Sequence, residues 1–261
     1  MVDDGSLLAV LHEATDAVHA ALGSLEDWGP AGTRPGQYLC DLAADRAALE
    51  VLDRAGLGVL SEETGLHHPD RPLLVVTDPV DGSTNASRRL PWYATSLCVL
   101  DGDGARAAVV ANQATGTRYE AVRGGGARRQ GTPIRPAPAV ALGAALVAVN
   151  GLPPHSLGWR QFRCLGAAAL DLCAVADGSL DGYVDCTVDA HGPWDYLGGM
   201  LVCQEAGAVV ADAFERPLVG RAPADRRTPV AASSAPLLAA LVEARTSYAR
   251  RSSDPAGRPA E

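Results

Sequence analysis

The sequence predicts an α+β or α/β fold made of two halves with different secondary-structure patterns. In the N-terminal half, about 1–140, two helical patterns precede short apolar strands joined by tight turns, which is typical of helices lying on a largely antiparallel sheet. In the C-terminal half, about 141–246, strands and helices alternate, which favours a smaller, mixed and partly parallel sheet. The tail at 247–261 is rich in Arg, Ser, Pro and Gly and is predicted to be disordered.

The elements of the N-terminal half follow from the spacing of apolar residues. Leucines, alanines and valines at helical spacing predict helices at 6–22 and 37–54. Apolar and β-branched runs predict a short strand within 58–65 and further strands at 73–76, 93–100, 105–112 and 117–122. The sequence Asp101-Gly102-Asp103-Gly104 predicts a hairpin turn between two of these strands, and Gly124-Gly125-Gly126 predicts another tight turn.

The C-terminal half begins after a bridge that contains Pro133, Pro136 and Pro138. Short apolar runs predict strands at 146–149, 182–184, 208–211 and 230–232. Between and after them, helical spacing predicts helices at 165–176, 194–206 and 235–245. Because each strand is separated from the next by a helix or a long loop, parallel pairing is expected for part of this sheet.

The composition is that of an ordinary globular protein. The chain has 261 residues, 47% of them hydrophobic, which is enough to bury a large core. It contains no apolar run near the roughly 20 residues that a membrane-spanning helix needs. Its start, with Asp3 and Asp4, lacks the basic and apolar regions of a secretory signal, so we expect a cytoplasmic protein that does not bind membranes.

The charged residues and the cysteines limit the classes of function that are possible for this chain. The formal net charge of −9 argues against a nucleic-acid ligand, and no nucleic-acid partner is expected. The 22 Lys and Arg residues are all Arg, which excludes Schiff-base chemistry and a phosphate-binding lysine of the Walker type. The six cysteines show no Cys-x-x-Cys spacing and lie mostly in apolar segments, so they are predicted to be reduced core residues.

Acidic residues follow two of the predicted strands. Asp78 and Asp81 come directly after the apolar run 73–76, and Glu62 and Glu63 follow the strand that starts near Gly58. Two strands that end in carboxylates can converge on one hard cation, for which oxygen atoms are the preferred ligands. The residues Gly82-Ser83-Thr84-Asn85 are typical of a helix start, where backbone N–H groups can receive an anion. This stretch therefore predicts a metal-assisted phosphate site.

A third acidic position lies in His191-Gly192-Pro193-Trp194-Asp195. Asp195 falls where a Gly-Pro turn gives way to a helix, and taken alone it would be interpreted as an acid of the first helical turn. Together with the other acids, it becomes a candidate metal ligand from the second half of the chain.

Combined, these motifs resemble those of the inositol monophosphatase family, the lithium-sensitive, magnesium-dependent phosphatases. The stretch Asp78-Pro79-Val80-Asp81-Gly82-Ser83-Thr84-Asn85 is similar to the family's first signature. The stretch from Trp194-Asp195 to Glu205-Ala206-Gly207 is similar to the second, and Ser61-Glu62-Glu63 resembles the family's Gly-Glu-Glu turn. The resemblance extends to about residue 245 and implies a layered αβαβα sandwich.

The resemblance also implies a site. Its metal ligands would be Glu62, Asp78, Asp81, Asp195 and the carbonyl of Val80, holding two or three Mg²⁺ ions, for which Mn²⁺ can substitute. Glu62 and Ser83 would activate the attacking water, and Gly82 and Ser83 would hold the phosphate. Asp45 would be a helper acid, meaning an acid of the preceding helix with a later metal role, and Asp41 is the fallback for it. The residues implied to contact the substrate are Asp185, Ala168 and His191, with Arg163 nearby.

The identity of the substrate stays open. The resemblance favours a small phosphate monoester, such as inositol monophosphate or another polyol or sugar phosphate, and a homodimer. Histidinol phosphate is an alternative; a 3′-phosphonucleotide is disfavoured because Asn85 stands where that branch tends to have an acid. The loop between Asp185 and Trp194 looks longer than in inositol-specific members, so Asp189 or His191 could enter the pocket. The alternative outside enzymes is a catalytically silent scaffold or regulatory binder, against which the complete set of carboxylates argues.

Overall fold

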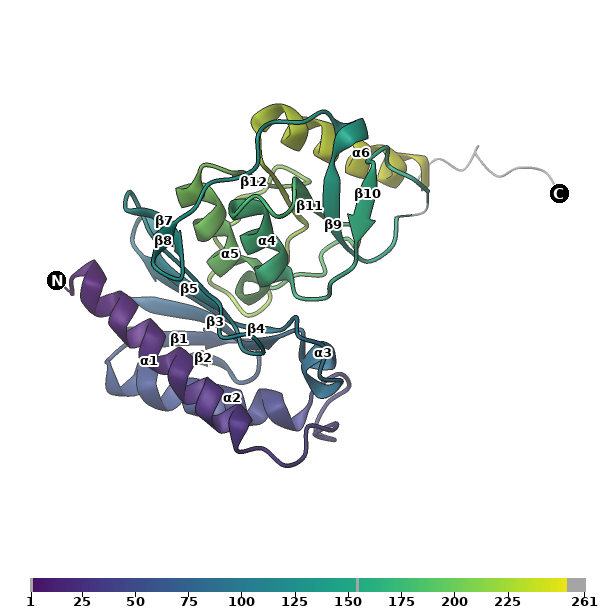
Figure 1. Cartoon of the computed structure of the whole chain (residues 1–261). Coiled ribbons are helices and arrows are strands. Elements are labelled where there is room, and N and C mark those ends of the chain that lie inside the picture. The colour runs from purple at the N-terminus through teal and green to yellow at the C-terminus, as the bar shows by residue number, and fades with distance from the viewer. Residues whose placement is uncertain (1, 154, 253–261) are drawn as a thin grey trace.

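The computed structural model describes residues 2–153 and 155–252, which form five layers (Figure 1). Helices α1 (Asp4–Gly23) and α2 (Leu39–Arg54) cover one face of an eight-stranded sheet, and α4 (Ala168–Ala176) and α5 (Pro193–Ala206) cover its other face. A five-stranded sheet follows, with α6 (Ala235–Ser252) on its outer side. This order confirms the predicted αβαβα sandwich. Within the described residues, no helix combines the length and apolar character that crossing a membrane requires.

The larger sheet is almost entirely antiparallel, as predicted. Its strand order is β2-β1-β3-β4-β5-β6-β7-β8, and only β1 and β3 pair in parallel. The bounds are β1 Gly58–Ser61, β2 Gly65–His67, β3 Leu74–Asp81, β4 Ala94–Asp101, β5 Gly104–Asn112, β6 Arg118–Val122, β7 Gly126–Arg129 and β8 Thr132–Pro133, with the short helix α3 (Ser83–Ser87) after β3.

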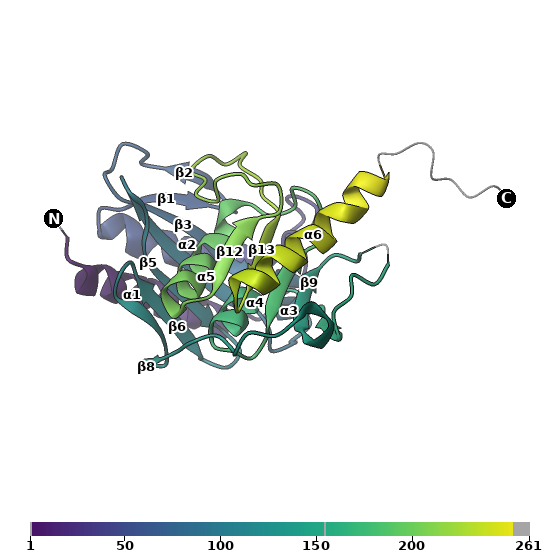
Figure 2. The same ribbon diagram turned by 90° about the horizontal axis from the view of Figure 1, so that it is seen from above.

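The smaller sheet is mixed, which also confirms the prediction. Its order is β10-β9-β11-β13-β12; β10, β9 and β11 are parallel to one another, whereas β13 is antiparallel to both of its neighbours. The bounds are β9 Leu146–Asn150, β10 Gln161–Arg163, β11 Gly182–Asp185, β12 Val209–Asp212 and β13 Pro229–Ala232, with a 3₁₀ turn, η1, at Leu142–Ala144. Figure 2 shows α6 lying across this sheet, on the side away from the larger one.

Some predicted boundaries were wrong. Strand β3 does not stop at Val76 but continues through both acids to Asp81, fully buried along its length. The helix expected from 165 begins only at Ala168, because Gly166 adopts a left-handed φ of 86°. The tail expected to be disordered from 247 continues the helix α6 to Ser252, and the rest of that prediction, 253–261, lies outside the described residues.

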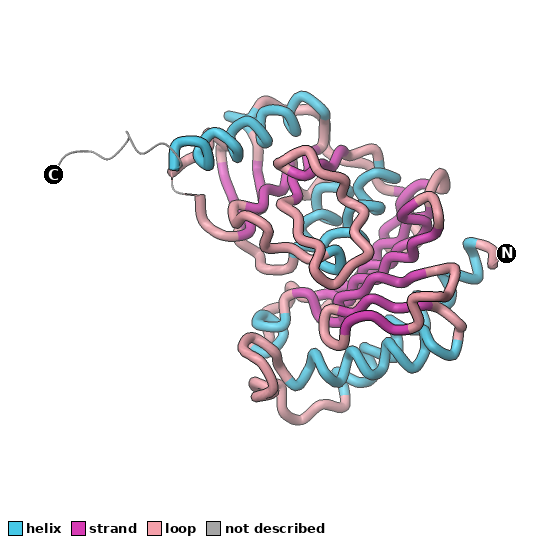
Figure 3. The backbone as a smooth tube through the Cα atoms, turned by 180° about the vertical axis from the view of Figure 1, so that it is seen from behind, coloured by secondary structure: helices cyan, strands magenta, loops and turns pink. Residues whose placement is uncertain are grey.

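The core explains how the two sheets are held at a fixed distance. Helices α4 and α5 fill the space between them (Figure 3), and a large cluster of buried side chains joins residues of both helices to both sheets. All six cysteines are free and five are buried, as predicted, while Cys164 is exposed. Two glycines let α5 approach its neighbours: a Cβ at Gly199 would lie 2.6 Å from the Cβ of Leu172 on α4, and one at Gly198 would lie 2.6 Å from Ser96 Oγ on β4.

This close packing makes Gly199 a sensitive position. Gly199→Ala is expected to lower the free energy of unfolding by about 1–3 kcal/mol, because the new methyl group has to displace α4. The matched control is Gly23→Ala at the end of α1, where a Cβ meets nothing within 4 Å and no loss is expected. Chemical denaturation of both variants measures the difference, and equal stabilities would contradict this account of the helix packing.

Candidate active site

The end of strand β3 supplies two of the acids. Asp78 and Asp81 are three residues apart, a spacing that in a regular strand puts side chains on opposite faces. Between them, however, the pairing with β4 shifts: Asp78 is opposite Ser96, and Asp81 is opposite Ala94, so β3 contains one extra residue. This β-bulge compensates for the odd spacing and allows both carboxylates to face the same side. The sequence reasoning did not anticipate the bulge.

Glu62 reaches the same edge from the neighbouring strand. Strand β1 pairs in parallel with β3, Ser61 beside Thr77, and the N–H of Glu62 donates to the carbonyl oxygen of Thr77 (3.2 Å). Because the carboxyl ends of parallel strands meet at one edge of a sheet, the residue after β1 lies beside Asp78. The two predicted strand ends therefore converge.

Asp195 enters from the opposite layer. It lies in the first turn of α5, and its Oδ2 accepts a hydrogen bond of 2.7 Å from the N–H of Gly192, so it caps its own helix. One ligand oxygen from each of Glu62, Asp78 and Asp195 lies within 4.8 Å of the others. This carboxylate cluster consists of oxygen donors alone, the set that Mg²⁺ or Mn²⁺ prefers.

The electrostatics of the cluster fit a cation. Burial, reinforced by the charges of Asp195 and Glu63, raises the pKa of Glu62 to about 8. Burial and the charges of Glu62 and Asp81 raise the pKa of Asp78 well above its usual range. Burial and the charge of Asp195 likewise raise the pKa of Asp81 to about 8. A divalent ion would stabilise the ionised forms of these carboxyl groups, so the residues present fit the predicted metal.

Asp81 and the residues after it form the boundary between the two halves. Asp81 Oδ2 accepts a hydrogen bond of 2.7 Å from the N–H of Ala169, in the first turn of α4, and Ala168 begins that helix. Gly82 has a φ of 86°, and a Cβ there would lie 2.9 Å from the carbonyl oxygen of Gly166. Only glycine fits this turn, which directs the chain into α3 and makes Ser83 its first residue.

The remaining predicted ligand is the carbonyl of Val80. The residue is buried between the two acids, and its N–H donates to Asp78 Oδ1 (2.9 Å). This bond fixes the carboxylate of Asp78 on the bulge. The role of the Val80 carbonyl oxygen stays a prediction.

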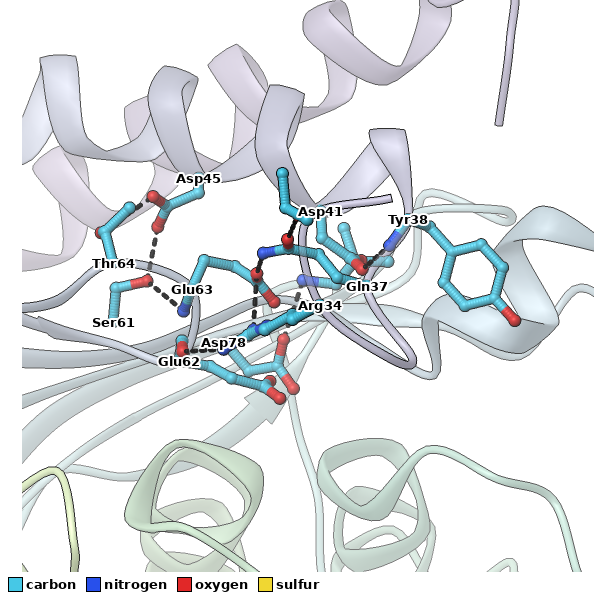
Figure 4. A network of polar contacts seen from close by, with 12 residues as sticks. Arg34, Gln37, Tyr38, Asp41, Asp45, Ser61, Glu62, Glu63, Thr64 and Asp78 are labelled. Carbon is cyan, nitrogen blue, oxygen red and sulfur yellow. Dashed lines mark hydrogen bonds and ion pairs between the residues drawn. The ribbon is translucent and has the colours of Figure 1, made fainter. Parts of the chain in front are cut away.

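Asp45 and Asp41, on α2, are buried near the cluster but are not part of it. Both oxygens of Asp45 accept hydrogen bonds from hydroxyls, at 2.5 Å from Ser61 and 2.9 Å from Thr64. Figure 4 shows Asp45 on the side of α2, whereas Glu62 and Asp78 face the C-terminal half. Asp45 thus stabilises the turn that carries Glu62, and its role as a helper acid stays a prediction.

Asp41 is engaged at the start of the same helix. Its Oδ2 accepts a hydrogen bond of 2.8 Å from the N–H of Tyr38, and burial raises its pKa to about 7. The side chain of Asp41 is thus occupied in capping α2. Its alternative role, in place of Asp45 as the helper acid, also stays a prediction.

A contact that sequence reasoning missed holds the other glutamate of the turn. Glu63 Oε2 accepts hydrogen bonds from Arg34 (2.7 Å) and from Gln37, and its side chain is only 5% exposed (Figure 4). Arg34 also donates to the carbonyl oxygen of Glu62 (3.4 Å). The Gly- and Pro-rich loop before α2 thereby fixes the turn. Because the partners are 29 residues apart, no local pattern signals them.

The predicted substrate residues Asp185 and His191 lie deep in the C-terminal half. Asp185, at the end of β11, has no exposed surface, and its Oδ1 accepts hydrogen bonds from Asn150 Nδ2 (3.0 Å) and the N–H of Thr187 (2.9 Å). Burial raises its pKa. Arg163, by contrast, is exposed on β10 and bonds to its neighbours Phe162 and Gln161.

His191 is buried between acidic groups. Its Nδ1 lies 3.3 Å from Asp195 Oδ2, and its Nε2 lies 2.7 Å from Tyr183 Oη and 3.9 Å from Asp185 Oδ2. Burial opposes the charged form of the ring, but the hydrogen bond to Asp195 and the charges of Asp195 and Asp185 outweigh it and raise the pKa of His191 to about 9. His191 therefore contacts a candidate metal ligand directly.

Comparison with known proteins agrees with this geometry. Residues 39–247 match the sequence model of the inositol monophosphatase family. The protein "Nus factor SuhB" of Escherichia coli (strain K12) is 30% identical over 226 residues, which cover 80% of each chain. The "fructose-1,6-bisphosphatase/inositol-1-monophosphatase" of Archaeoglobus fulgidus is 30% identical over 221 residues, covering 81% of this chain and 86% of that one.

Solved structures show the same fold. The inositol monophosphatase of Anabaena (Nostoc) sp. PCC 7120 superposes with a TM-score of 0.77 at 24% identity, covering 93% of this chain and 96% of that one. A protein of Pyrococcus horikoshii described as similar to inositol-1 monophosphatase gives a TM-score of 0.79 at 22% identity, covering 91% and 96%. The match over most of the chain, on a fold that brings these carboxylates together, shows that the protein belongs to the inositol monophosphatase family.

Proposed function

We propose that the protein is a Mg²⁺-dependent phosphomonoesterase that hydrolyses a small phosphate monoester. The observation that carries the proposal is the meeting of Glu62, Asp78 and Asp195 within 4.8 Å, beside Asp81 and the start of α3. The family is one of metal-dependent phosphatases, and an all-carboxylate cluster at a turn with backbone N–H groups suits a phosphate ester bridged by a cation.

The protein's own groups would divide the work as follows. Glu62, held by β1 and by the Arg34 contact to its carbonyl, would orient and deprotonate the attacking water together with the Ser83 hydroxyl. The N–H groups of Gly82 and Ser83 would hold the phosphate oxygens. Bound Mg²⁺ would neutralise phosphate charge and favour ionisation of the water. No covalent enzyme intermediate is needed.

The substrate class we propose is a polyol or sugar phosphate, with inositol monophosphate the leading candidate. Support comes from the family and from the A. fulgidus relative, whose name joins inositol and fructose phosphatase activities. Histidinol phosphate is the comparison substrate. The E. coli relative is named as a Nus factor, and the opposing proposal of a silent regulatory binder predicts no turnover at all. The absence of a nucleic-acid partner and the homodimer stay predictions, resting on net charge and on the resemblance respectively.

Activity tests the proposal directly. The full chain is expected to release phosphate from at least one compound in a panel of inositol, sugar, histidinol and nucleotide phosphates, only with Mg²⁺ or Mn²⁺ present. Asp81→Asn and Glu62→Gln should each lower kcat/KM by more than about 100-fold, because they remove charge from the centre. The control Glu50→Gln makes the same isosteric change on an exposed part of α2 and should leave kcat/KM unchanged.

Two results would contradict the enzyme proposal. One is the absence of turnover with every panel member in the presence of metal. The other is an Asp81→Asn variant as fast as the parent.

The metal-free protein should also respond to pH in a defined direction. The folded pKa values of Glu62 and Asp81 are raised to about 8, so between their usual values and about pH 8 the folded state holds protons that the unfolded chain has lost. The stability that these protons contribute is therefore fully present below the usual pKa values of the two acids. The free energy of unfolding then falls as pH rises through this window. In EDTA, urea denaturation should show a loss of at least about 1 kcal/mol from pH 5 to pH 8.

Mg²⁺ at pH 8 should restore the lost stability, since it binds the folded, ionised cluster. Asp78→Asn removes one of the charges and should flatten the pH dependence in EDTA. A metal-free parent equally stable at both pH values would show that the carboxylates do not repel one another as described.

A further inference from the structure

The loop between β11 and α5 holds His191 in a fixed place. At its start, the N–H of Cys186 donates to the carbonyl oxygen of Asn150 (2.8 Å), and in its middle the N–H of Asp189 donates to Thr228 Oγ1 (3.0 Å). At its end, His191 forms an isolated β-bridge with Arg227, whose N–H donates to the His191 carbonyl oxygen (2.9 Å). These anchors along the loop fix the backbone position from which the ring of His191 extends.

Both ring nitrogens are already engaged. Nδ1 faces Asp195 Oδ2 at 3.3 Å, and Nε2 faces Tyr183 Oη at 2.7 Å, with the whole residue only 9% exposed. The ring also interacts with Asp185, whose Oδ2 is 3.9 Å from Nε2, and with Asp81 and Asp171, which act on it through their charges. A ring in this position has no free nitrogen and little surface to offer to a substrate.

The direction of the hydrogen bonds follows from the two neighbours of the ring. The carboxylate of Asp195 only accepts hydrogen bonds, so Nδ1, which faces it, carries the proton when the ring is neutral. Tyr183 is fully buried, and burial raises the pKa of its hydroxyl well above the usual range, so it keeps its proton and donates to the unprotonated Nε2. If the ring is charged, both nitrogens carry protons. In either state Nδ1–H points at Asp195.

Asp195 Oδ2 thus receives two donors from consecutive residues, the ring of His191 and the backbone N–H of Gly192 at 2.7 Å. Both contacts fall on the same oxygen, which leaves Oδ1 outside them. Such outer contacts commonly fix the orientation of a metal-binding carboxylate and tune its affinity.

We propose that His191 is a positioning residue for Asp195: backed by Tyr183 on strand β11, it fixes the orientation of the carboxylate that α5 contributes to the candidate metal centre. This inference rests on the proposed function and gives His191 a role other than the substrate contact that the sequence predicted. A substrate contact would act on the KM for the phosphate ester, whereas a positioning residue acts on metal affinity before any substrate is present.

Two substitutions test the contacts of the two ring nitrogens separately. In His191→Asn the amide nitrogen can occupy the place of Nδ1 and still donate to Asp195, whereas the contact to Tyr183 is lost. In His191→Gln the longer side chain can reach the place of Nε2 and bond to Tyr183, whereas the contact to Asp195 is lost. The measurement is calorimetric titration of the full chain with Mn²⁺ and no substrate, with thermal unfolding as a check on folding.

The expected result is a dissociation constant for Mn²⁺ that rises about tenfold or more in His191→Gln and stays within about threefold of the parent in His191→Asn. With saturating metal, the KM for the phosphate ester should stay at the parent value in His191→Asn. Tyr183→Phe removes only the hydroxyl behind the ring, the contact that His191→Asn also loses, and should likewise stay within about threefold of the parent. If His191→Gln does not fold, His191→Leu, which can make neither contact, takes its place and should raise the dissociation constant about tenfold.

Unchanged Mn²⁺ affinity in His191→Gln, or in His191→Leu where that variant decides, would overturn the proposal. Equal losses in the Asn and Gln variants would also overturn it, because they would show that ring packing, and not the Nδ1 contact, matters. A parent that binds Mn²⁺ with the expected variant pattern but releases no phosphate would contradict the proposed function and still support the role of His191. A parent that binds no Mn²⁺ would overturn both.

Discussion

Repulsion among buried carboxylates is the constraint on which the centre of this molecule depends. Glu62, Asp78 and Asp195 place oxygens within 4.8 Å of one another, and burial with like charge raises the pKa of Glu62 to about 8. Such a cluster destabilises a protein that has no cation to bind, because each ionised group is wholly or partly shielded from water and faces other acids. The packing of the rest of the chain has to hold the acids together against this cost, and binding of a divalent ion offsets it.

Three features of the fold hold the acids together: the pairing of two strands, a β-bulge and the close packing of a helix. Parallel pairing of β1 with β3 places Glu62 beside Asp78, and the bulge in β3 turns Asp81 toward the same side. Close contacts at Gly198 and Gly199 seat α5 between α4 and the larger sheet, which brings Asp195 across from the other layer. The site therefore belongs to both halves, and neither half carries it alone. Contacts from Arg34 and Gln37 to Glu63 and from hydroxyls to Asp45 stabilise the turn at its edge.

Sequence reasoning picked out the acids that the structure brings together because each stands next to a strong local signal: the end of an apolar run, a Gly-Ser-Thr-Asn helix start, or a Gly-Pro-Trp turn. It found the layer order through the family resemblance, and most strands and helices through periodicity. It missed β7, β8 and β10, which are short or exposed strands with little apolar patterning. It also missed the Arg34–Glu63 pair and the burial of His191, since both depend on contacts between distant segments that leave no periodic trace.

The central claim is that a cation binds where the two sheets bring their carboxylates together. Crystals of the full chain soaked in Mn²⁺ and measured for anomalous scattering test it most directly. The account predicts an anomalous peak among Glu62, Asp78 and Asp195, within coordination distance of their oxygens. Strong peaks elsewhere with none among these three side chains would contradict it.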